Sequence, residues 1–87
     1  MNRYGKRLEM HYRTHRAVDL EQLSAPQEFF SRLGLEIAER VDERADQIAG
    51  TMSPTASFVD RMGLLGEARF TAESEVMAHF QEAHLDL

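Results

Sequence analysis

The chain has 87 residues, with 15 acidic and 10 basic side chains and a net charge of −5 at pH 7. This length predicts one small domain over residues 1–87. The absence of cysteine excludes disulfides and thiolate metal sites, and no apolar run approaches the roughly 20 residues of a membrane span. No apolar segment follows the basic N-terminus, so we expect no signal peptide, no membrane association and a cytoplasmic location.

The first predicted element is an amphipathic helix over 4–17. At about 100° per residue, one face carries the aromatic, aliphatic and histidine side chains Tyr4, Leu8, His11, Tyr12 and His15. The opposite half carries five basic residues, Arg3, Lys6, Arg7, Arg13 and Arg16. Residues 1–16 therefore have five cations against Glu9, a net charge of +4, while the rest of the chain has fourteen acids against five arginines, a net charge of −9. Such a dipolar molecule is suited to recognising charged partners.

The i,i+4 spacing of His11 and His15 would allow both imidazoles to bind one metal ion. However, "HYRTH" lacks the glutamate that follows the first histidine in zinc peptidases, and no third ligand lies nearby. We therefore expect packed or hydrogen-bonded histidines, with no metal and no cofactor.

The second predicted helix covers 25–49. Ser24 is its expected N-cap with Gln27 as capping-box partner, Pro26 fits the first turn, and Gly50 is the expected terminator. Its apolar face carries Phe29, Phe30, Leu33, Ile37, Val41 and Ile48. Its other face is a row of acids, Glu28, Glu36, Glu39, Asp42, Glu43 and Asp46.

The third predicted helix covers 54–83, with Ser53 as N-cap and Pro54 at the first helical position. Its expected apolar side comprises Phe58, Val59, Met62, Leu65, Phe70, Val76, Met77 and Phe80. Leu35 and Leu64 fall outside the apolar stripes of their helices, which indicates a second contact surface.

These elements predict an all-α fold. The two long helices form an antiparallel hairpin across a short connection, and the short N-terminal helix lies across it. Such a rod covers few residues from all sides, so we expect a partner chain, either another copy or a different protein. Gly63 and Gly66 support this expectation, because each costs about 1 kcal/mol within a helix and close approach of another backbone would compensate. A local kink is the alternative.

A polar cluster interrupts the apolar stripes. Arg69 and Glu73 project into the stripe of the third helix, and Arg44 into that of the second, so the hairpin could bring Arg44 close to Glu73. Because unpaired buried charges are costly, these groups should be paired or lie at a stripe edge. The cluster then either fixes partner register or contacts a ligand, or is a surface ion pair of at most about 1 kcal/mol.

Catalytic motifs are absent from the sequence. It contains no Gly-rich phosphate loop, no nucleophile elbow and no cysteine. The acids belong to an exposed helix face, where nothing raises a carboxyl pKa. We expect that the protein is not an enzyme.

Three segments, "NRYGKRLEMHYRTHR", "APQEFFSRLGLEIAERV" and "MGLLGEARFTAESEVM", together resemble the TnpV-type transposon-encoded protein family. The matching motifs are Tyr4-Gly5-Lys6 leading to His15-Arg16, and Ala68-Arg69 leading to Ala72-Glu73. The resemblance implies a small protein of a bacterial mobile element and supplies no established activity.

Two functions remain as expectations. In the first, a non-catalytic accessory or regulator of a mobile element binds a protein or nucleoprotein, with DNA contact by the basic face of the first helix. In the second, the acids Glu36, Glu39, Asp42, Glu43 and Asp46 imitate phosphates, and the protein inhibits a host defence complex as anti-CRISPR proteins do. In either case we expect a homo-oligomer.

Overall fold

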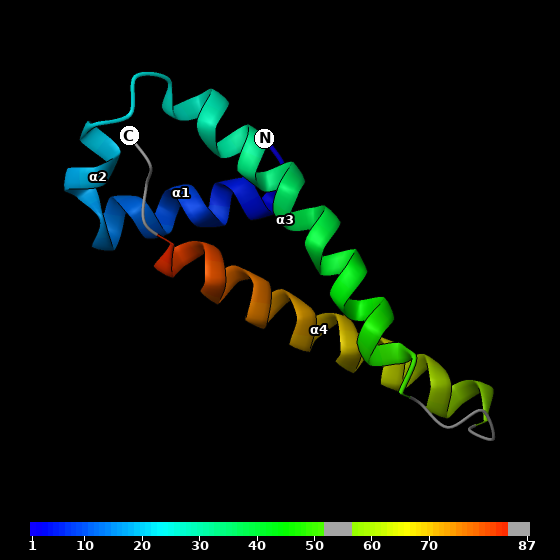
Figure 1. Ribbon diagram of the computed structural model, residues 1–87. Coiled ribbons are helices and arrows are strands. Elements are labelled where there is room, and N and C mark those ends of the chain that lie inside the picture. Colours follow the sequence, from blue (N-terminus) through cyan, green and yellow to red (C-terminus); the bar gives the residue numbers. More distant parts are fainter. Residues whose placement is uncertain (52–56, 84–87) are drawn as a thin grey trace.

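The computed structural model describes residues 1–51 and 57–83, without the side chain of Phe58. Four helices occupy these residues: α1 (Arg3–His15), α2 (Ala17–Glu21), α3 (Pro26–Ala49) and α4 (Phe58–Glu82), as Figure 1 shows. No strand occurs in them, which confirms the predicted all-α class. Within the same residues, no helix combines the length and apolar character needed to cross a membrane.

The helix α1 begins at an asparagine cap. The Asn2 Oδ1 accepts a hydrogen bond from the Gly5 backbone N–H at 2.9 Å, which satisfies one of the free amides of the first turn. The helix ends at His15, two residues earlier than expected: Arg16 has φ −135° and ψ 46°, and the separate helix α2 follows. The predicted single helix over 4–17 is therefore wrong at its C-terminal end.

The helix α3 follows its predicted bounds closely but has a different cap. It starts at Pro26, as expected for a residue without an N–H, yet Ala25 is the N-cap and no side chain caps the helix. The predicted capping box of Ser24 and Gln27 is therefore wrong. Gly50 closes the helix, and its N–H donates to the Asp46 carbonyl at 2.9 Å.

The helix α4 begins at Phe58, and the Ser57 hydroxyl oxygen accepts from the Asp60 N–H at 3.2 Å. The predicted cap at Ser53 and Pro54 lies outside the described residues, and the helix starts later than the predicted position 54. It ends at Glu82, close to the predicted end.

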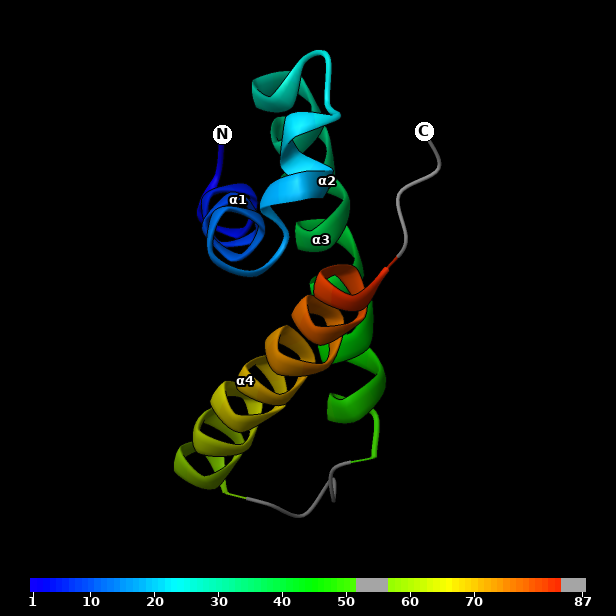
Figure 2. The same cartoon turned by 90° about the vertical axis from the view of Figure 1, so that its left-hand side faces the viewer.

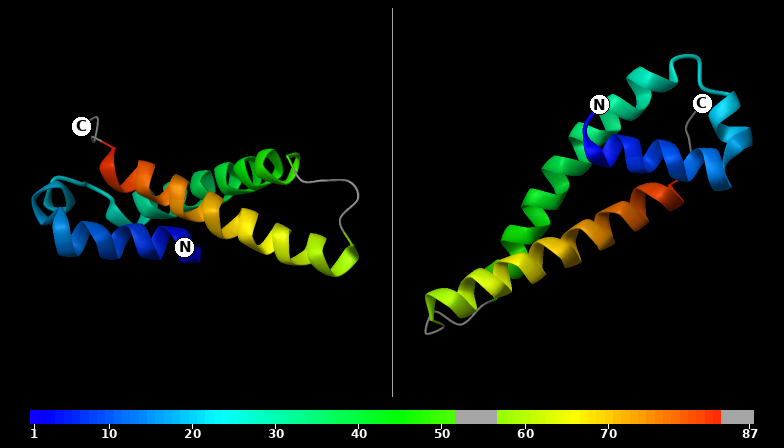
Figure 3. Two further views of the ribbon diagram at one scale, coloured as in Figure 1. Left: turned by 90° about the horizontal axis from the view of Figure 1, so that it is seen from below. Right: turned by 180° about the vertical axis from the view of Figure 1, so that it is seen from behind.

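The molecule is elongated, with extents of 51 × 20 × 19 Å. The helices α3 and α4 run in opposite directions and contact one another, and α1 lies in the angle between α3 and the C-terminal half of α4 (Figures 1 and 3). At the other end, the N-terminal part of α4 diverges from the end of α3, as the rotated view in Figure 2 shows.

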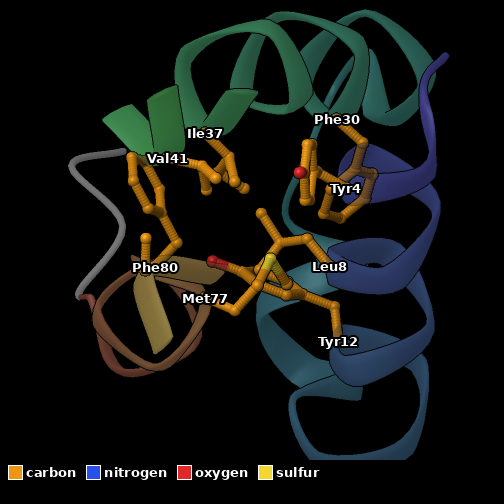
Figure 4. Close-up of a cluster of buried hydrophobic side chains, with 9 residues drawn as sticks. Tyr4, Leu8, Tyr12, Phe30, Ile37, Val41, Met77 and Phe80 are labelled. Atoms are coloured by element: carbon orange, nitrogen blue, oxygen red, sulfur yellow. The ribbon is translucent and has the colours of Figure 1, made fainter. Parts of the chain in front are cut away.

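The core lies where α1, α3 and α4 meet (Figure 4). Its buried side chains come from all three helices: Tyr4, Leu8, Tyr12, Phe30, Ile37, Val41, Ala72, Met77 and Phe80. The Tyr12 and Phe30 rings meet edge to face, with centroids 5.2 Å apart. The predicted apolar faces of α1 and α3 are confirmed by this burial, except that His11 is only half-buried and His15 is exposed.

Two glycines allow α1 and α3 to cross closely. A Cβ on Gly5 would lie 2.5 Å from the Phe30 carbonyl oxygen. A Cβ on Gly34 would overlap the Asn2 Oδ1 and lie 2.9 Å from the Gly5 nitrogen. The Asn2 Nδ2 also donates to the Gly34 carbonyl at 2.8 Å, so the capping side chain joins the two helices. The crossing has backbone contact that no larger residue at either glycine would permit.

The predicted apolar side of α4 is correct only in its C-terminal half. Val76, Met77 and Phe80 are covered, but Val59, Met62, Leu65 and Phe70 are exposed. In the middle of the helix, the buried side chains are those of Ala68 and Ala72, at relative exposures of 3% and 0%. Two small residues on this side permit a close helix contact that bulkier residues would prevent, so the buried face has a different phase from the predicted stripe.

Candidate interaction surfaces

The outward side of α1 is basic, as predicted. Lys6, Arg7 and Arg13 are exposed, and Arg13 forms an i,i+4 ion pair with Glu9 at 3.3 Å. Among the described residues, no acid forms an ion pair with Lys6 or Arg7. The exposed strip from Arg3 to Arg13 spans about 15 Å at 1.5 Å per residue. It can therefore contact several anionic groups of a macromolecule at once.

The remaining two basic residues of the predicted face serve the fold itself. The Arg3 Nη2 donates to the Glu73 carboxylate at 2.6 Å, although most of the Arg3 side chain remains exposed. Arg16 is largely covered, with 16% of its side chain exposed. The structure therefore leaves Lys6, Arg7 and Arg13 as the accessible part of this face, with Arg3 at its edge.

Arg16 connects α1, α2 and the end of α4. Its Nε donates to Asp19 Oδ2 at 2.8 Å, and its Nη1 donates to the carbonyls of Gln81 at 3.1 Å and Ala83 at 2.6 Å. Its guanidinium also lies over the Tyr12 ring, 4.6 Å from the centroid. A helix C-terminus has carbonyls without intrahelical partners and a partial negative charge. Arg16 donates hydrogen bonds to two of these carbonyls and places its positive charge beside them.

Burial of Tyr12 gives stability a dependence on alkaline pH. Desolvation raises the pKa of the Tyr12 phenol above its usual value of 10.0, and the nearby Arg16 charge opposes this shift in part. The unfolded chain therefore releases this proton at lower pH than the folded protein, so the contribution to stability is complete below pH 10 and is lost as pH rises further. In urea titrations from pH 9 to 11.5, we expect the unfolding free energy of the wild type to fall more steeply than that of Tyr12→Phe. Equal slopes would contradict this assignment.

On the acidic side of α3, as on the basic side of α1, some residues form ion pairs within the protein and others are exposed without one in the described residues. Glu36 forms an ion pair with Arg40 at 3.1 Å, and Asp42 with Arg69 at 2.9 Å. Glu39, Glu43 and Asp46 are exposed and follow one another at i, i+4 and i+7, so they form a row along the helix. None of these three forms an ion pair within the described residues.

The predicted polar cluster of Arg44, Arg69 and Glu73 exists as two separate groups. The Arg44 Nε donates to Glu75 Oε2 at 2.7 Å, so the expected approach to Glu73 is wrong. This hydrogen bond lowers the pKa of the Glu75 carboxyl. Glu75 lies slightly more than half a turn from Glu73, about 200° around the helix. The phase of α4 differs from the prediction, so Arg44 reaches a different acid.

The second group is centred on Glu73. Its Oε1 accepts from Arg3 at 2.6 Å and from the Tyr4 hydroxyl at 3.0 Å, and lies 3.6 Å from the Arg69 Nε. Arg69 in turn reaches Asp42 on α3. One carboxylate, 16% exposed, therefore joins the start of α1 to α4, while Arg69 extends the connection to α3.

The His11 and His15 rings lie beside one another with centroids 5.0 Å apart and an interplanar angle of 45°. In the part of the chain that the structure describes, no group of three or more His, Cys, Asp or Glu side chains is arranged to hold a metal ion.

An open groove of about 510 Å³ runs along α4 beside the start of α1. Its lining combines apolar side chains, one glycine and charged groups: Arg3, Met62, Leu65, Gly66, Arg69, Phe70 and Glu73. The sequence pattern predicts Met62, Leu65 and Phe70 on the apolar side of this helix, which makes the exposure of this surface a correction. The signals that pointed to a further contact here were Leu64 and the two inner glycines.

No family model, curated protein or solved structure matches this chain. Two of the sequence motifs described above, the one that contains Tyr4 and the one that contains Glu73, meet in the fold, because Tyr4 bonds to Glu73. Both motifs therefore include residues that hold α1 against α4.

Proposed function

We propose that this protein is a non-catalytic accessory or regulatory protein of a mobile element, and that it acts by binding a macromolecular partner as a homo-oligomer. The outward face of α1 is the proposed binding surface. The mobile-element setting comes from the resemblance of the two motifs, and the mode of action comes from the surface charges.

The observation that supports the proposal most directly is the state of Lys6 and Arg7. Both are exposed on a protein of net charge −5, and neither has an acidic ion-pair partner in the described residues. The α1 helix that carries them is held at its start by Asn2 and Glu73 and at its end by Arg16. A rigid cationic strip of this kind suits phosphates or an acidic protein surface. Tyr4 and Tyr12 are buried, so they are not available to stack on bases.

The test is affinity capture from the source organism with quantitative mass spectrometry, with and without nuclease. We expect the double reversal Lys6→Glu/Arg7→Glu to lose at least tenfold of the captured partner, because two unneutralised cations are replaced by acids. Nuclease sensitivity distinguishes a nucleoprotein from a protein.

The matched control is Arg32→Glu/Arg61→Glu, which changes the net charge equally but uses exposed cations of α3 and α4. Equal loss in both double variants would show that only net charge matters and would contradict the proposal.

The exposed row of Glu39, Glu43 and Asp46 favours a second candidate, in which this acidic side occupies a nucleic-acid-binding groove of a host defence complex. In the same assay, Glu39→Gln/Glu43→Gln/Asp46→Asn would then abolish capture, whereas the α1 double reversal would leave it intact. The two candidates thus predict opposite outcomes for the two sets of variants.

A further inference from the structure

The first part of α4 has little cover from the rest of the described residues. Every residue in 59–67, which we name the arm, is exposed. An isolated helix of this length is marginal in water, and the arm contains two glycines, the least favourable helix residues after proline. A Cβ on Gly63 or Gly66 would meet nothing within 4 Å. Packing against the described residues therefore requires neither glycine.

The arm has one apolar face that continues into Phe70. At 100° per residue, Val59, Met62, Gly66 and Phe70 lie within a stripe about 80° wide. The same stripe continues through Glu73 and Met77, which belong to the half of α4 beside α1 (Figure 3). The helix α1 begins at Arg3, which contacts α4 at Glu73. The part of the stripe that precedes Glu73 is therefore uncovered, and the groove beside Arg3 and Phe70 is its open surface.

We infer that this stripe is the interface of a homodimer, in which the arms of two copies pair antiparallel. This inference rests on the homo-oligomer of the proposed function and assigns its contact surface. A two-fold axis passing close to Gly66 and Glu67 places Phe70 of one copy opposite Gly63 of the other, and the same contact occurs a second time by symmetry. The Phe70 ring then occupies the space beside Gly63, which has no side chain. The glycines, which the isolated chain does not need, are what this close approach requires.

The available area is adequate for a specific dimer of moderate affinity. Val59, Met62 and Phe70 of the stripe are exposed by 78%, 56% and 73%, and Leu65, which lies beside the stripe and lines the same groove, by 42%. These fractions correspond to roughly 500 Å² of apolar surface per copy. A pair would bury about 1,000 Å², the lower limit for specific interfaces. We therefore expect dissociation on the order of micromolar concentration.

The first test is sedimentation equilibrium of the full chain from about 0.1 μM to about 100 μM, a range that brackets such an affinity. The expected mass rises from that of the 10.0 kDa monomer to twice that value. Phe70→Glu should remain monomeric throughout, with unchanged helicity because this side chain is exposed. The matched control Leu35→Glu changes an equally exposed apolar residue on α3 and should dimerise normally. A monomer at all concentrations, or equal loss of dimer in both variants, would overturn the inference.

The second test uses Gly63→Ala, which cannot fail by unfolding the monomer because its methyl group enters open space. We expect a higher melting temperature at low concentration and a dimer dissociation constant at least tenfold weaker, because the methyl group occupies the position of the opposite Phe70. An unchanged or tighter dimer would exclude this interface. Lys6→Glu/Arg7→Glu should dimerise normally, so failure of the basic-face proposal and failure of the dimer are distinguishable.

Discussion

Replacing Gly34 by alanine should destabilise the fold by about 2–3 kcal/mol, although alanine is the better helix former. The added methyl group would overlap the Asn2 Oδ1 and come within 3.0 Å of the Gly5 backbone. The collision involves main-chain atoms of α1, so relief requires the two helices to separate. That separation also removes the Asn2 hydrogen bond to the Gly34 carbonyl. Urea denaturation followed by circular dichroism at about 222 nm measures the effect through the helical signal.

The control for this prediction is the same substitution at Gly63, measured at a concentration where the chain is monomeric. Among the described residues, nothing outside the adjacent backbone of α4 lies within 4 Å of the new methyl group, so the helix propensity of alanine should act alone and stabilise by up to about 1 kcal/mol. The two Gly→Ala changes should therefore have opposite signs. If Gly34→Ala were neutral or stabilising, the close crossing of α1 and α3 would be wrong.

The second large effect is expected for Arg16→Ala, with a loss of about 2–3 kcal/mol in the unfolding free energy. This change removes both hydrogen bonds to the end of α4, the bond to Asp19 and the packing over Tyr12. It leaves carbonyls at the end of α4 without their donor. Chemical denaturation together with hydrogen exchange of the last turn of α4 measures the loss.

Two further variants separate the fork geometry of Arg16 from its charge. Arg16→Lys keeps the charge but cannot donate to three acceptors from a planar group, so it should recover less than half of the lost stability. Arg13→Ala removes an exposed arginine two residues before the end of α1 and should change stability by no more than about 0.5 kcal/mol. Similar losses for Arg13→Ala and Arg16→Ala would contradict the structural role of Arg16.

The apolar faces of α1 and α3 could be predicted because each helix buries one regular stripe for most of its length. Tyr4, Leu8 and Tyr12 are buried on α1, and Phe30 and Ile37 on α3. Helical periodicity alone therefore identifies two of the three walls of the core.

The buried face of α4 could not be predicted in the same way. Periodicity weighs large apolar residues more than alanine, so Leu65 and Phe70 were assigned to the core in place of Ala68 and Ala72. The register of α3 against α4 then depends on how closely the alanines allow the backbones to approach, which no single-helix pattern contains. For this reason the partner of Arg44 was predicted as Glu73, whereas the structure has Glu75.

Helical periodicity predicts a basic face on α1, but it does not predict which of the basic residues are exposed and which stabilise the fold. The helical projection assumed that α1 continues through Arg16, whereas the chain turns there and brings the guanidinium to the end of α4. Local propensity did not indicate this turn, because the carbonyl partners of Arg16 at the end of α4 lie more than sixty residues away in the sequence.

The side chain of Asn2 has a consequence for which residues can occupy that position. Its Oδ1 accepts a hydrogen bond from the Gly5 N–H, and its Nδ2 donates one to the Gly34 carbonyl, so both ends of the side-chain amide are used. An aspartate would keep the first contact and set a negative oxygen against the second, and a serine would be too short to make both. Asn2, Gly5 and Gly34 thus form an interdependent trio, and related chains that preserve this crossing should retain or exchange all three together.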